Sequence, residues 1–589
     1  MDAVLKANIA SILGLTLPSG AAFLLDTYTG AVAAYSVRRL ATAATVLLRV
    51  RRDTAGGTGD DDEADVAYDS NNILSLDSAI SNASAGVTAT TLGEFINVGT
   101  VGGTTYSNPD SLTGTAIAYV PEWTDQSGNN ADATQATHSV QRRIHDGTTN
   151  GDLEQSNGKP TLFGPSGGGF SASLPNTTQP FCCMVFDKDT SDFSTWHSAN
   201  ANWMALGDAV ALTNVSNGMG TLTAYKNGSQ MTLSTRTQFK ADIGSDQLLF
   251  THTTTASITA RTWYFAQYFT SATAYNIRPS LQENIMWGTD QSSNRSGIEE
   301  NINSEFLIYQ PTDTPTSGLL ATYSGAAAAY SVRQLANTAV IAMTVRRDSD
   351  DEEKRFGFDA NGDLDTAGIA SFCGSANGYV SQWWDQSTNG NHASQGTAVN
   401  QPQIYDGTAV ITENGKPALF VNGNASINGN ALYASGFGTG NTRYFSYVAR
   451  MTQDSSPGDY HNPVMFLQTA PNTAGTNFFQ TYTTNASNSI SVNYPTAALD
   501  MSNTTATNVQ HLLSLQKTST DSEFWIDGTS QDTATGTQNL EDELSIGKFQ
   551  NYGRAVMRFQ ELVVWNTDQD GAGNRTGIET NINSYFSIY

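Results

Sequence analysis

Short apolar runs separated by polar turns recur along the whole chain. Examples are 45–50, 340–345 and 562–565, which consist mainly of β-branched and aliphatic residues. Clusters rich in Asn, Gly, Ser and Thr lie between such runs, as at 127–130 and 388–391. Many short strands with frequent turn signals are typical of sandwiches and jelly rolls. The pattern therefore predicts an all-β protein made of β-sandwich (jelly-roll) domains.

Helical patterns are short and few. An apolar residue at every fourth position forms one stripe in 298–306 and again in 578–586. Such a stripe lies on one face of a helix, so both segments are expected to pack against a sheet. We also interpret the alanine-rich stretches that begin at Gly30 and Gly325 as short helical pieces.

The two halves of the chain carry the same motifs in the same order. YSxR, VRRD, WxDQS, GKP and NRxGIExNINS each occur once per half. A repeat of about 280 residues is too long for a solenoid unit and suits a β domain with its own core. We expect domains at 20–309 and 318–589. The segment 310–317, with two prolines, is expected to be a semi-stiff linker.

The first copy is longer than the second in one region. Asp53 matches Asp348, whereas Asp125 matches Asp385, so the first copy has 35 more residues between these points. Insertions gather in surface loops, where contacts to partners often lie. Any function that differs between the copies is therefore expected in this region.

Composition restricts the partners. The chain has 55 acidic and 29 basic residues and a net charge of −26. Nucleic acids and anionic membranes attract basic surfaces, so neither is expected as a partner. No apolar run reaches the roughly 18 to 20 residues that span a bilayer. Three cysteines are too few for a disulfide framework, and Cys182 and Cys183 are interpreted as buried strand residues.

The first 19 residues lie outside the repeat. Val4, Ile9, Ile12 and Leu13 could line one face of a short helix. We interpret residues 1–19 as an attachment segment that docks on a partner. A signal peptide is the alternative, which the acidic Asp2 and the absence of a clear cleavage site argue against.

The WxDQS loops are the best-preserved pair of polar segments. One interpretation is a loop that holds Ca²⁺ through Asp125 and Asp385, or that binds sugar hydroxyls beside a Trp face. The alternative is a turn in which Asp and Asn bond their own backbone. The candidate ligand-binding residues are Trp123, Asp125, Asn129, Asn130, Trp383, Trp384, Asp385, Asn389 and Asn391.

Other motifs give little support for catalysis. Ser166 lies in a G-x-S-x-G pattern but lacks the following helix that a nucleophile elbow needs. The histidines lack zinc-ligand spacing. The acidic runs 60–63 and 350–353 resemble solvated hairpin tips, with a weak cation site as the alternative. Structural roles are also expected for two carboxylate pairs, Glu283 with Glu561 and Glu299 with Glu579.

The motif order resembles that of concanavalin A-like sandwich domains in bacteriophage virion and tail-appendage proteins. It is also similar to the catalytic sandwich of AbfB-type α-L-arabinofuranosidases. That second resemblance implies an acidic nucleophile, an acid/base aspartate in a Gly-Gly-Asp-Asn stretch and an adjacent cysteine pair. In the matching segment 546–551, Phe549 occupies the position of the acid. Since hydrolysis needs two carboxyl groups, no catalytic residues are assigned.

These observations predict a non-enzymatic phage virion protein: a fibre, appendage or decoration subunit that binds host-surface glycans. It would attach to other virion subunits through residues 1–19. As a homo-oligomer it would gain avidity from several weak sites, without a cofactor other than Ca²⁺ at the loops. The alternatives are a purely architectural virion module and a glycoside hydrolase of the arabinofuranosidase type.

Overall fold

A computed structural model describes residues 23–164, 169–187, 280–422, 430–438, 440–452, 508–535, 542–547 and 556–589. Between 187 and 280, and between 452 and 508, it describes the strands and the helix named below and a few adjoining residues. The predicted attachment segment 1–19 lies outside the described residues.

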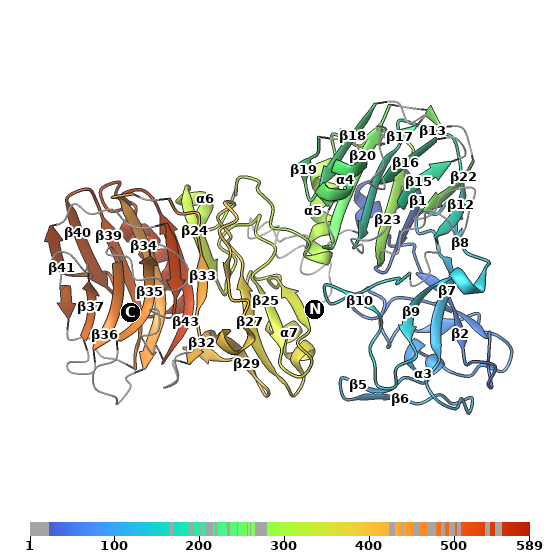
Figure 1. Ribbon diagram of the computed structural model, residues 1–589, viewed down its shortest axis with the longest axis horizontal. Helices are drawn as coiled ribbons and strands as arrows, with labels where there is room; N and C mark the ends of the chain where they lie inside the picture. The colour runs from blue at the N-terminus through green and yellow to red at the C-terminus, as the bar shows by residue number, and fades with distance from the viewer. Residues whose placement is uncertain are drawn as a thin grey trace, which may run out of the picture. The chain divides into compact units, whose positions relative to one another are not determined.

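The chain divides into two compact units, Met1–Ile308 and Tyr309–Tyr589. The predicted linker 310–317 is part of the second unit. The side-chain oxygen of Gln310 accepts hydrogen bonds from the backbone N–H groups of Val340 and Ile341, at 2.9 and 3.0 Å. Each unit is an all-β sandwich of two antiparallel sheets (Figure 1).

The first unit contains a six-stranded and an eleven-stranded sheet. The smaller sheet has the order β1 (Ala31–Ser36), β23 (Leu281–Trp287), β14 (Phe181–Phe186), β20 (Leu248–Thr254), β18 (Leu222–Lys226) and β19 (Ser229–Gln230). The larger sheet has the order β17 (Ser216–Asn217), β16 (Asn202–Leu206), β15 (Ser194–Ala199), β22 (Arg261–Phe265), β12 (Phe170–Leu174), β8 (Ala133–Thr134), β7 (Ile117–Trp123), β2 (Leu48–Asp53), β3 (Glu63–Val66) and β4 (Ile80–Ser81), and β9 (Arg142–Asp146) also pairs with β7.

The second unit repeats both sheets. The smaller one has the order β24 (Ala326–Ser331), β43 (Val556–Trp565), β34 (Arg443–Thr452), β39 (Gln510–Lys517), β40 (Asp521–Ile526) and β41 (Thr529–Thr535). The larger one has the order β38 (Met501–Asn503), β37 (Ser489–Asn493), β36 (Phe479–Thr484), β35 (Tyr460–Leu467), β42 (Glu543–Ile546), β33 (Leu432–Ala434), β28 (Ala393–Ser394), β27 (Asn377–Trp383), β25 (Met343–Arg347) and β26 (Glu353–Phe356). β29 (Gln403–Asp406) pairs with β27, and β32 (Leu419–Asn422) links β29 to β43 and so joins the sheets.

Short elements complete the two units. The hairpins are β5 (Gly99–Val101) with β6 (Thr104–Tyr106), β10 (Gln155–Ser156) with β11 (Lys159–Pro160), and β30 (Thr412–Glu413) with β31 (Lys416–Pro417). A further two-stranded sheet pairs β13 (Thr177–Thr178) with β21 (Ser257–Ile258), which are distant in the chain. The helices among the described residues are α2 (Leu24–Thr27), α3 (Leu92–Ile96), α4 (Arg236–Ile243), α5 (Arg295–Phe306), α6 (Leu319–Thr322), α7 (Thr366–Cys373) and α8 (Arg575–Phe586), with 3₁₀ turns at His138–Val140 and Ala398–Asn400. Among the described residues no helix has the length and apolarity to cross a bilayer.

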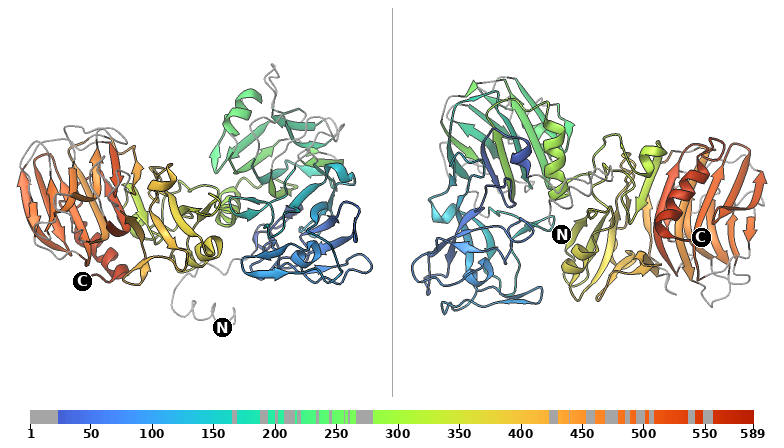
Figure 2. Two further views of the ribbon diagram at one scale, coloured as in Figure 1. Left: turned by 60° about the horizontal axis from the view of Figure 1, so that its bottom comes forward. Right: turned by 180° about the vertical axis from the view of Figure 1, so that it is seen from behind.

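The predicted apolar stripes are confirmed in α5 and α8. Ile298, Ile302 and Phe306 are buried in α5, and the corresponding residues of α8 are buried as well. α5 contacts β20, and α8 contacts β39 on the outer face of the six-stranded sheet (Figure 2, right). These strands are therefore covered on both faces, and every residue of β39 is buried.

The prediction of helices at the alanine-rich stretches is wrong. These residues form the strands β1 and β24, which pair with β23 and β43 along their whole length. Alanine favours helices intrinsically, but tertiary packing overrides that preference here. Four-residue helices, α2 and α6, lie just before the strands instead.

The 35 extra residues of the first copy form a folded extension. They contribute β4 and the β5–β6 hairpin, on either side of α3. The Tyr106 hydroxyl donates to Asp77 at 2.8 Å, and the Tyr106 ring packs on α3 at Gly93. A Cβ at Gly93 would lie 2.5 Å from that ring, so this contact requires glycine. The insertion is thus packed onto the domain rather than being a free loop.

Candidate functional site

The Asp125 carboxylate of the first WxDQS loop is fully used inside the protein. Its Oδ1 accepts hydrogen bonds from the backbone N–H groups of Ala34 and Ser127, both at 2.9 Å. Its Oδ2 accepts from the Ala131 N–H at 3.1 Å and from the Ser127 hydroxyl at 2.8 Å. Four donors converge on one buried carboxylate, which fixes both the loop and the strand beside it.

The second loop has the same geometry. Asp385 accepts from the backbone N–H groups of Ala329 and Ser387, both at 2.8 Å, and of Asn391 at 3.0 Å. The Ser387 hydroxyl adds a bond at 2.8 Å. Burial raises the pKa of Asp385, and the hydrogen bonds that it accepts oppose this shift.

The glutamine that follows each aspartate completes the contact to the edge strand. The Gln126 N–H donates to the carbonyl of Ala34 in β1 at 2.8 Å. Its side chain accepts from the Leu40 N–H at 2.8 Å and donates to the Arg38 carbonyl at 3.0 Å. Gln386 makes the equivalent bonds in the second unit. Each loop therefore satisfies backbone groups along the free edge of β1 or β24, which an exposed edge strand would leave unpaired.

The tryptophans of the loops are core residues. Trp123 and Trp383 are 1% and 0% exposed, and Trp384 is 8% exposed. Trp123 packs against the rings of Tyr35 and Phe170, with 5.8 Å between centroids in both pairs. Their ring faces are thus occupied by protein neighbours.

The asparagines of the loops also bond to the edge strands. The side-chain amides of Asn129 and Asn389 donate to the carbonyls of Ala31 and Ala326, at 2.9 and 2.8 Å. Asn391 donates to the Ala327 carbonyl at 2.9 Å. Asn130 adopts a positive φ of 54°, a conformation that asparagine tolerates in turns.

The nine predicted site residues thus gather as two equivalent loops that close a sheet edge. This geometry is that of the turn interpretation, and binding of a sugar or of Ca²⁺ at these loops stays a prediction. Within the part of the chain that the structure describes, no group of three or more His, Cys, Asp and Glu side chains is placed to hold a metal ion.

One residue of the loops differs between the units, and because it is a histidine in the second unit, the stability of that unit should depend on pH. Nδ1 of His392 accepts a hydrogen bond from the Asp385 N–H at 3.0 Å, whereas in the first unit the carboxylate of Asp132 accepts from the Asp125 N–H. Burial and then the charge of Arg355 lower the pKa of His392 to about 4. The folded unit therefore disfavours protonation of this ring, which titrates near pH 6.5 when unfolded.

We expect the second unit to lose about 2 kcal/mol of stability through His392 on going from neutral pH to about pH 5. The sign follows because a folded-state pKa below the unfolded value makes protons bind preferentially to the unfolded chain. Thermal unfolding of the full chain and of His392→Asn across this range measures the difference. A wild-type pH dependence identical to that of the variant would contradict the assignment.

A buried ion pair ties each YSxR motif to the last strand and the last helix. Arg38 holds Glu283 with two hydrogen bonds of 2.8 and 3.1 Å, and the Ser36 hydroxyl donates to the same carboxylate at 2.7 Å. Arg38 also donates to Asn301 of α5 at 3.0 Å. Glu283 is 0% exposed. Its carboxylate is fully engaged in structure, as the sequence predicts.

The second unit repeats this network. Arg333 holds Glu561 with bonds of 2.8 and 2.9 Å, Ser331 donates to Glu561 at 2.6 Å, and Arg333 donates to Asn581 of α8 at 2.9 Å. The NINS motif thus supplies the asparagine that completes the arginine's hydrogen bonding in both units.

The other residues that the sequence analysis considered for chemistry are buried or paired with protein groups where the structure describes them. Cys182 and Cys183 are buried in β14, and burial raises the pKa of both thiols. Glu299 in α5 and Glu579 in α8 lie on the buried faces of these helices rather than on their exposed surfaces, and each is paired with an arginine one turn earlier. Ser166 and Phe549 lie outside the described residues.

The acidic runs are hairpin tips, as predicted, but they also neutralise arginines. Asp61 and Asp62 bond to Arg51 and Arg52, both at 2.6 Å. In the second unit, acids of the run 350–353 bond in the same way to Arg346 and Arg347. The runs therefore serve the adjacent RRD motif.

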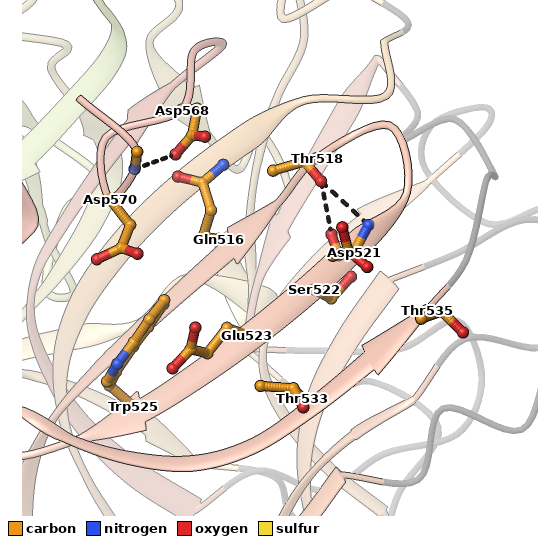
Figure 3. Close-up of a pocket in the computed structure, with 11 residues that line it drawn as sticks. Gln516, Thr518, Asp521, Ser522, Glu523, Trp525, Thr533, Thr535, Asp568 and Asp570 are labelled. Carbon is orange, nitrogen blue, oxygen red and sulfur yellow. Dashed lines mark hydrogen bonds between the residues drawn. The ribbon is translucent and has the colours of Figure 1, made fainter. Parts of the chain in front are cut away.

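A pocket of about 700 Å³ in the second unit is a site that the sequence reasoning missed. It lies on the outer face of β39–β41, beside the loop that leads into α8. Figure 3 shows carboxylates on both sides of the pocket, with Asp568 and Asp570 on the loop and Asp521 at the β39–β40 turn. Its lining residues are Gln516, Thr518, Asp521, Ser522, Glu523, Trp525, Thr533, Thr535, Asp568, Asp570 and Gly571.

Strand alternation places one set of side chains on this face. Asp521, Glu523 and Trp525 alternate along β40, so they point to the same side of the sheet. Glu523 is paired with Thr533 of β41 on one side and Gln516 of β39 on the other. Gln516 accepts a hydrogen bond from the Gln569 N–H at 2.9 Å, which holds the loop against the sheet.

The Arg575 side chain packs against Trp525, which forms the floor of the pocket. The guanidinium of Arg575 lies 4.5 Å from the centre of the Trp525 ring, and Trp525 is 3% exposed. Nε of Arg575 donates to Asp570 at 2.7 Å, and its Nη1 donates to Glu579 at 2.6 Å. Because Arg575 is engaged on three sides, it fixes the floor and one wall of the pocket.

Three pocket carboxylates are without an ion-pair partner among the described residues: Asp521, Glu523 and Asp568. Each accepts one hydrogen bond from within the protein, such as that from the Ser530 hydroxyl to Glu523 at 2.7 Å and that from the Gly571 N–H to Asp568 at 2.7 Å. A carboxylate has about four lone-pair positions. The pocket therefore presents a surface rich in hydrogen-bond acceptors.

The first unit lacks the carboxylates of β40 at the equivalent strand positions. Strand registers place Thr221, Thr223 and Tyr225 at the positions of Asp521, Glu523 and Trp525. Arg295 lies 4.0 Å from the Tyr225 ring centre, so the aromatic–arginine floor is shared. The sequence signal that could have revealed the pocket is this contrast between equivalent strands.

No protein-family model and no curated protein sequence matches the chain. Similar solved structures include a GH54 α-L-arabinofuranosidase soaked with a cyclic sulfate inhibitor, at 16% identity and a TM-score of 0.36, covering 45% of this chain and 64% of that one. The cellulose-induced protein Cip1 is 12% identical with a TM-score of 0.22, covering 27% and 83%. The botulinum neurotoxin serotype G binding domain is 7% identical with a TM-score of 0.22, covering 28% and 42%.

The region that matches the arabinofuranosidase spans less than two thirds of that enzyme's length. At these identities the likeness concerns the β-sandwich fold alone.

Proposed function

We propose that this protein is a non-catalytic carbohydrate-binding subunit of a bacteriophage particle, with a binding site in the second unit. The observation that carries the sugar-binding part is the pocket on β39–β41. Its volume of about 700 Å³ falls in the range of small-molecule sites, roughly 300 to 1,000 Å³. Its walls are polar side chains held by a rigid sheet and an anchored loop.

The chemistry of the lining suits a polyhydroxylated ligand. Sugar hydroxyls donate hydrogen bonds, and bonds to ionised acceptors are stronger than those between neutral groups. Glu523, Asp521 and Asp568 offer such acceptors, and Thr533 and Thr535 add hydroxyls that donate as well as accept. Since Arg575 occupies a face of Trp525, recognition depends on these polar groups rather than on ring stacking.

The virion part of the proposal rests on the motif order and on composition. The motifs YSxR, WxDQS and NRxGIExNINS resemble those of phage virion and appendage proteins. A net charge of −26 keeps copies on a particle surface from associating nonspecifically. Residues 1–19 would attach the chain to the particle, and several copies there would raise the effective concentration of weak sites.

We expect Glu523→Gln to weaken glycan binding by the full-length protein about tenfold, because a charge-assisted hydrogen bond becomes a neutral one. Glycan-array screening identifies the ligand, and titration calorimetry with that ligand measures the affinity of both forms. Asp532→Asn is the matched control, since it removes the same charge from the same hairpin at an exposed residue that does not line the pocket.

Equal losses in Glu523→Gln and Asp532→Asn would show that net charge, not the pocket, governs binding. Absence of binding to any glycan by the multimerised protein would contradict the sugar-binding proposal and favour the architectural alternative. Turnover of aryl glycosides that is lost on substitution of one carboxylate would instead favour the hydrolase alternative.

A further inference from the structure

Among the described residues, the pocket of the second unit carries more carboxylates than cations; the buried Lys517 ammonium interacts electrostatically with Asp521, and Arg575 pairs with Asp570. Asp521, Glu523 and Asp568 form no ion pair with any described residue. Arg575 already pairs with two carboxylates, Asp570 at 2.7 Å and Glu579 at 2.6 Å. A ligand that enters this pocket therefore meets Glu523 and Asp568, which form no ion pair with a described residue, and Asp521, on which the buried Lys517 ammonium acts electrostatically without forming an ion pair.

These carboxylates do not converge on a single point. They are distributed along β40 and the facing loop, and no metal-holding group is found among the described residues. A single small cation would contact one or two of them. An extended ligand with positive charges and hydroxyls at intervals would contact them along its length.

The first unit provides an internal comparison. The loop before α5 keeps Asp290 at the position of Asp568, and its Oδ1 accepts from the Ser292 N–H at 3.0 Å. The matching bonds from Asn294 to Gln291 and from Asn574 to Gln569 fix this alignment. Because the second loop is two residues longer, Asp570 has no acidic counterpart in the first unit. The second unit thus has three carboxylates, Asp521, Glu523 and Asp570, at positions where the first unit has no acidic residue.

We propose that this pocket selects a saccharide with free ammonium groups, that is, an oligomer of an amino sugar that is not N-acylated. This inference rests on the proposed sugar binding and specifies the class of ligand. Ammonium groups would bond to Glu523, Asp521 and Asp568, while ring hydroxyls bond to the threonines that line the pocket. Glycans with carboxylates or sulfates would be repelled by the same charges.

Two oligomers of equal length that differ only in N-acetylation test the charge selectivity. We expect the full-length protein to bind short glucosamine oligomers about tenfold more tightly than N-acetylglucosamine oligomers at mildly acidic pH, where the amines are protonated. The preference should shrink as salt is added, because exposed charges are screened. Titration calorimetry or ligand-detected NMR measures both affinities.

The double variant Asp521→Thr and Glu523→Thr carries the residues of the first unit at these positions, where the same fold accommodates them. We expect it to bind both oligomers more weakly than the wild type and to lose the preference for the charged one, so that the ratio of the two affinities falls to about one. Asp532→Asn, which changes charge outside the pocket, should keep the preference.

The outcomes separate the two proposals. Equal affinity of the wild type for both oligomers would overturn the charge selectivity and leave sugar binding intact. A linear polyamine that competes as well as the glucosamine oligomer would also overturn it, since the site would then recognise charge without sugar. If neither oligomer nor any arrayed glycan binds, the proposed function itself fails.

Discussion

Replacing Glu561 with Gln should lower the free energy of unfolding of the second unit by about 3 to 5 kcal/mol. The carboxylate is 0% exposed and accepts three hydrogen bonds, two from Arg333 and one from Ser331. Its neutralisation leaves the Arg333 guanidinium buried without its counter-charge. Calorimetric unfolding of the full chain measures the effect as a downward shift of one transition.

The chain offers its own controls for this experiment. Glu283→Gln should affect the first unit by a similar amount, and so shift the other transition. Glu413→Gln breaks the partly exposed pair with Arg450 and should cost less than about 1 kcal/mol. Replacing both members of the buried pair by apolar residues, Arg333→Met with Glu561→Leu, should recover much of the loss, because no unpaired charge remains. An unchanged second transition in Glu561→Gln would contradict the network.

Replacing Asp385 with Ala should also cost the second unit about 3 to 5 kcal/mol. Three backbone N–H groups and the Ser387 hydroxyl lose their acceptor in a loop where Asp385 is 0% exposed. One of these N–H groups, that of Ala329, belongs to the edge strand β24. Equilibrium denaturation of the full chain, followed by the fluorescence of buried tryptophans, reports the loss.

A surface turn provides the comparison for Asp385. Asp406 also accepts backbone N–H bonds, from Thr408 and Ala409, but it is exposed. Asp406→Ala should therefore have a much smaller effect, because water can satisfy the released N–H groups. If Asp385→Ala were as mild as Asp406→Ala, the loop would not be the structural element that its hydrogen bonds indicate. A loss of sugar or calcium binding without a loss of stability would favour the ligand interpretation of these loops.

Agreement between sequence and structure is best where local patterns carry the information. The stripe of Ile298, Ile302 and Phe306 defines one buried helix face, and the helix packs on a sheet as expected. The repeated WxDQS motif predicts a matched pair of segments, and the structure places them in equivalent loops of the two units. The partners of these loops cannot be predicted from the sequence, because Ala34 lies 91 residues from Asp125 and no local pattern encodes that contact.

Alanine-rich stretches show the opposite case. Local propensity favours a helix at Ala31–Ser36, yet these residues form a strand. Hydrogen bonds to β23 on one side and to the Asp125–Gln126 loop on the other satisfy the strand's backbone. Almost every residue of β1 is buried, and the small alanine side chains fit into this closely packed region. Pairing of β1 with β23, which is distant in the chain, thus outweighs the helix propensity of these residues, which amounts to about a few tenths of a kcal/mol per residue.

The sequence by itself determined that the chain is an all-β protein with two copies of one motif order, each closed by an amphipathic helix. It did so because alternation, turn residues and repeats are local properties. Only the tertiary structure decided that Arg38 and Arg333 neutralise glutamates more than 200 residues away, and that the predicted loops close a sheet edge. It also brought β39, β40, β41 and the loop before α8 together as a pocket. Side chains from segments distant in sequence meet only when sheet register and helix packing place them on one face.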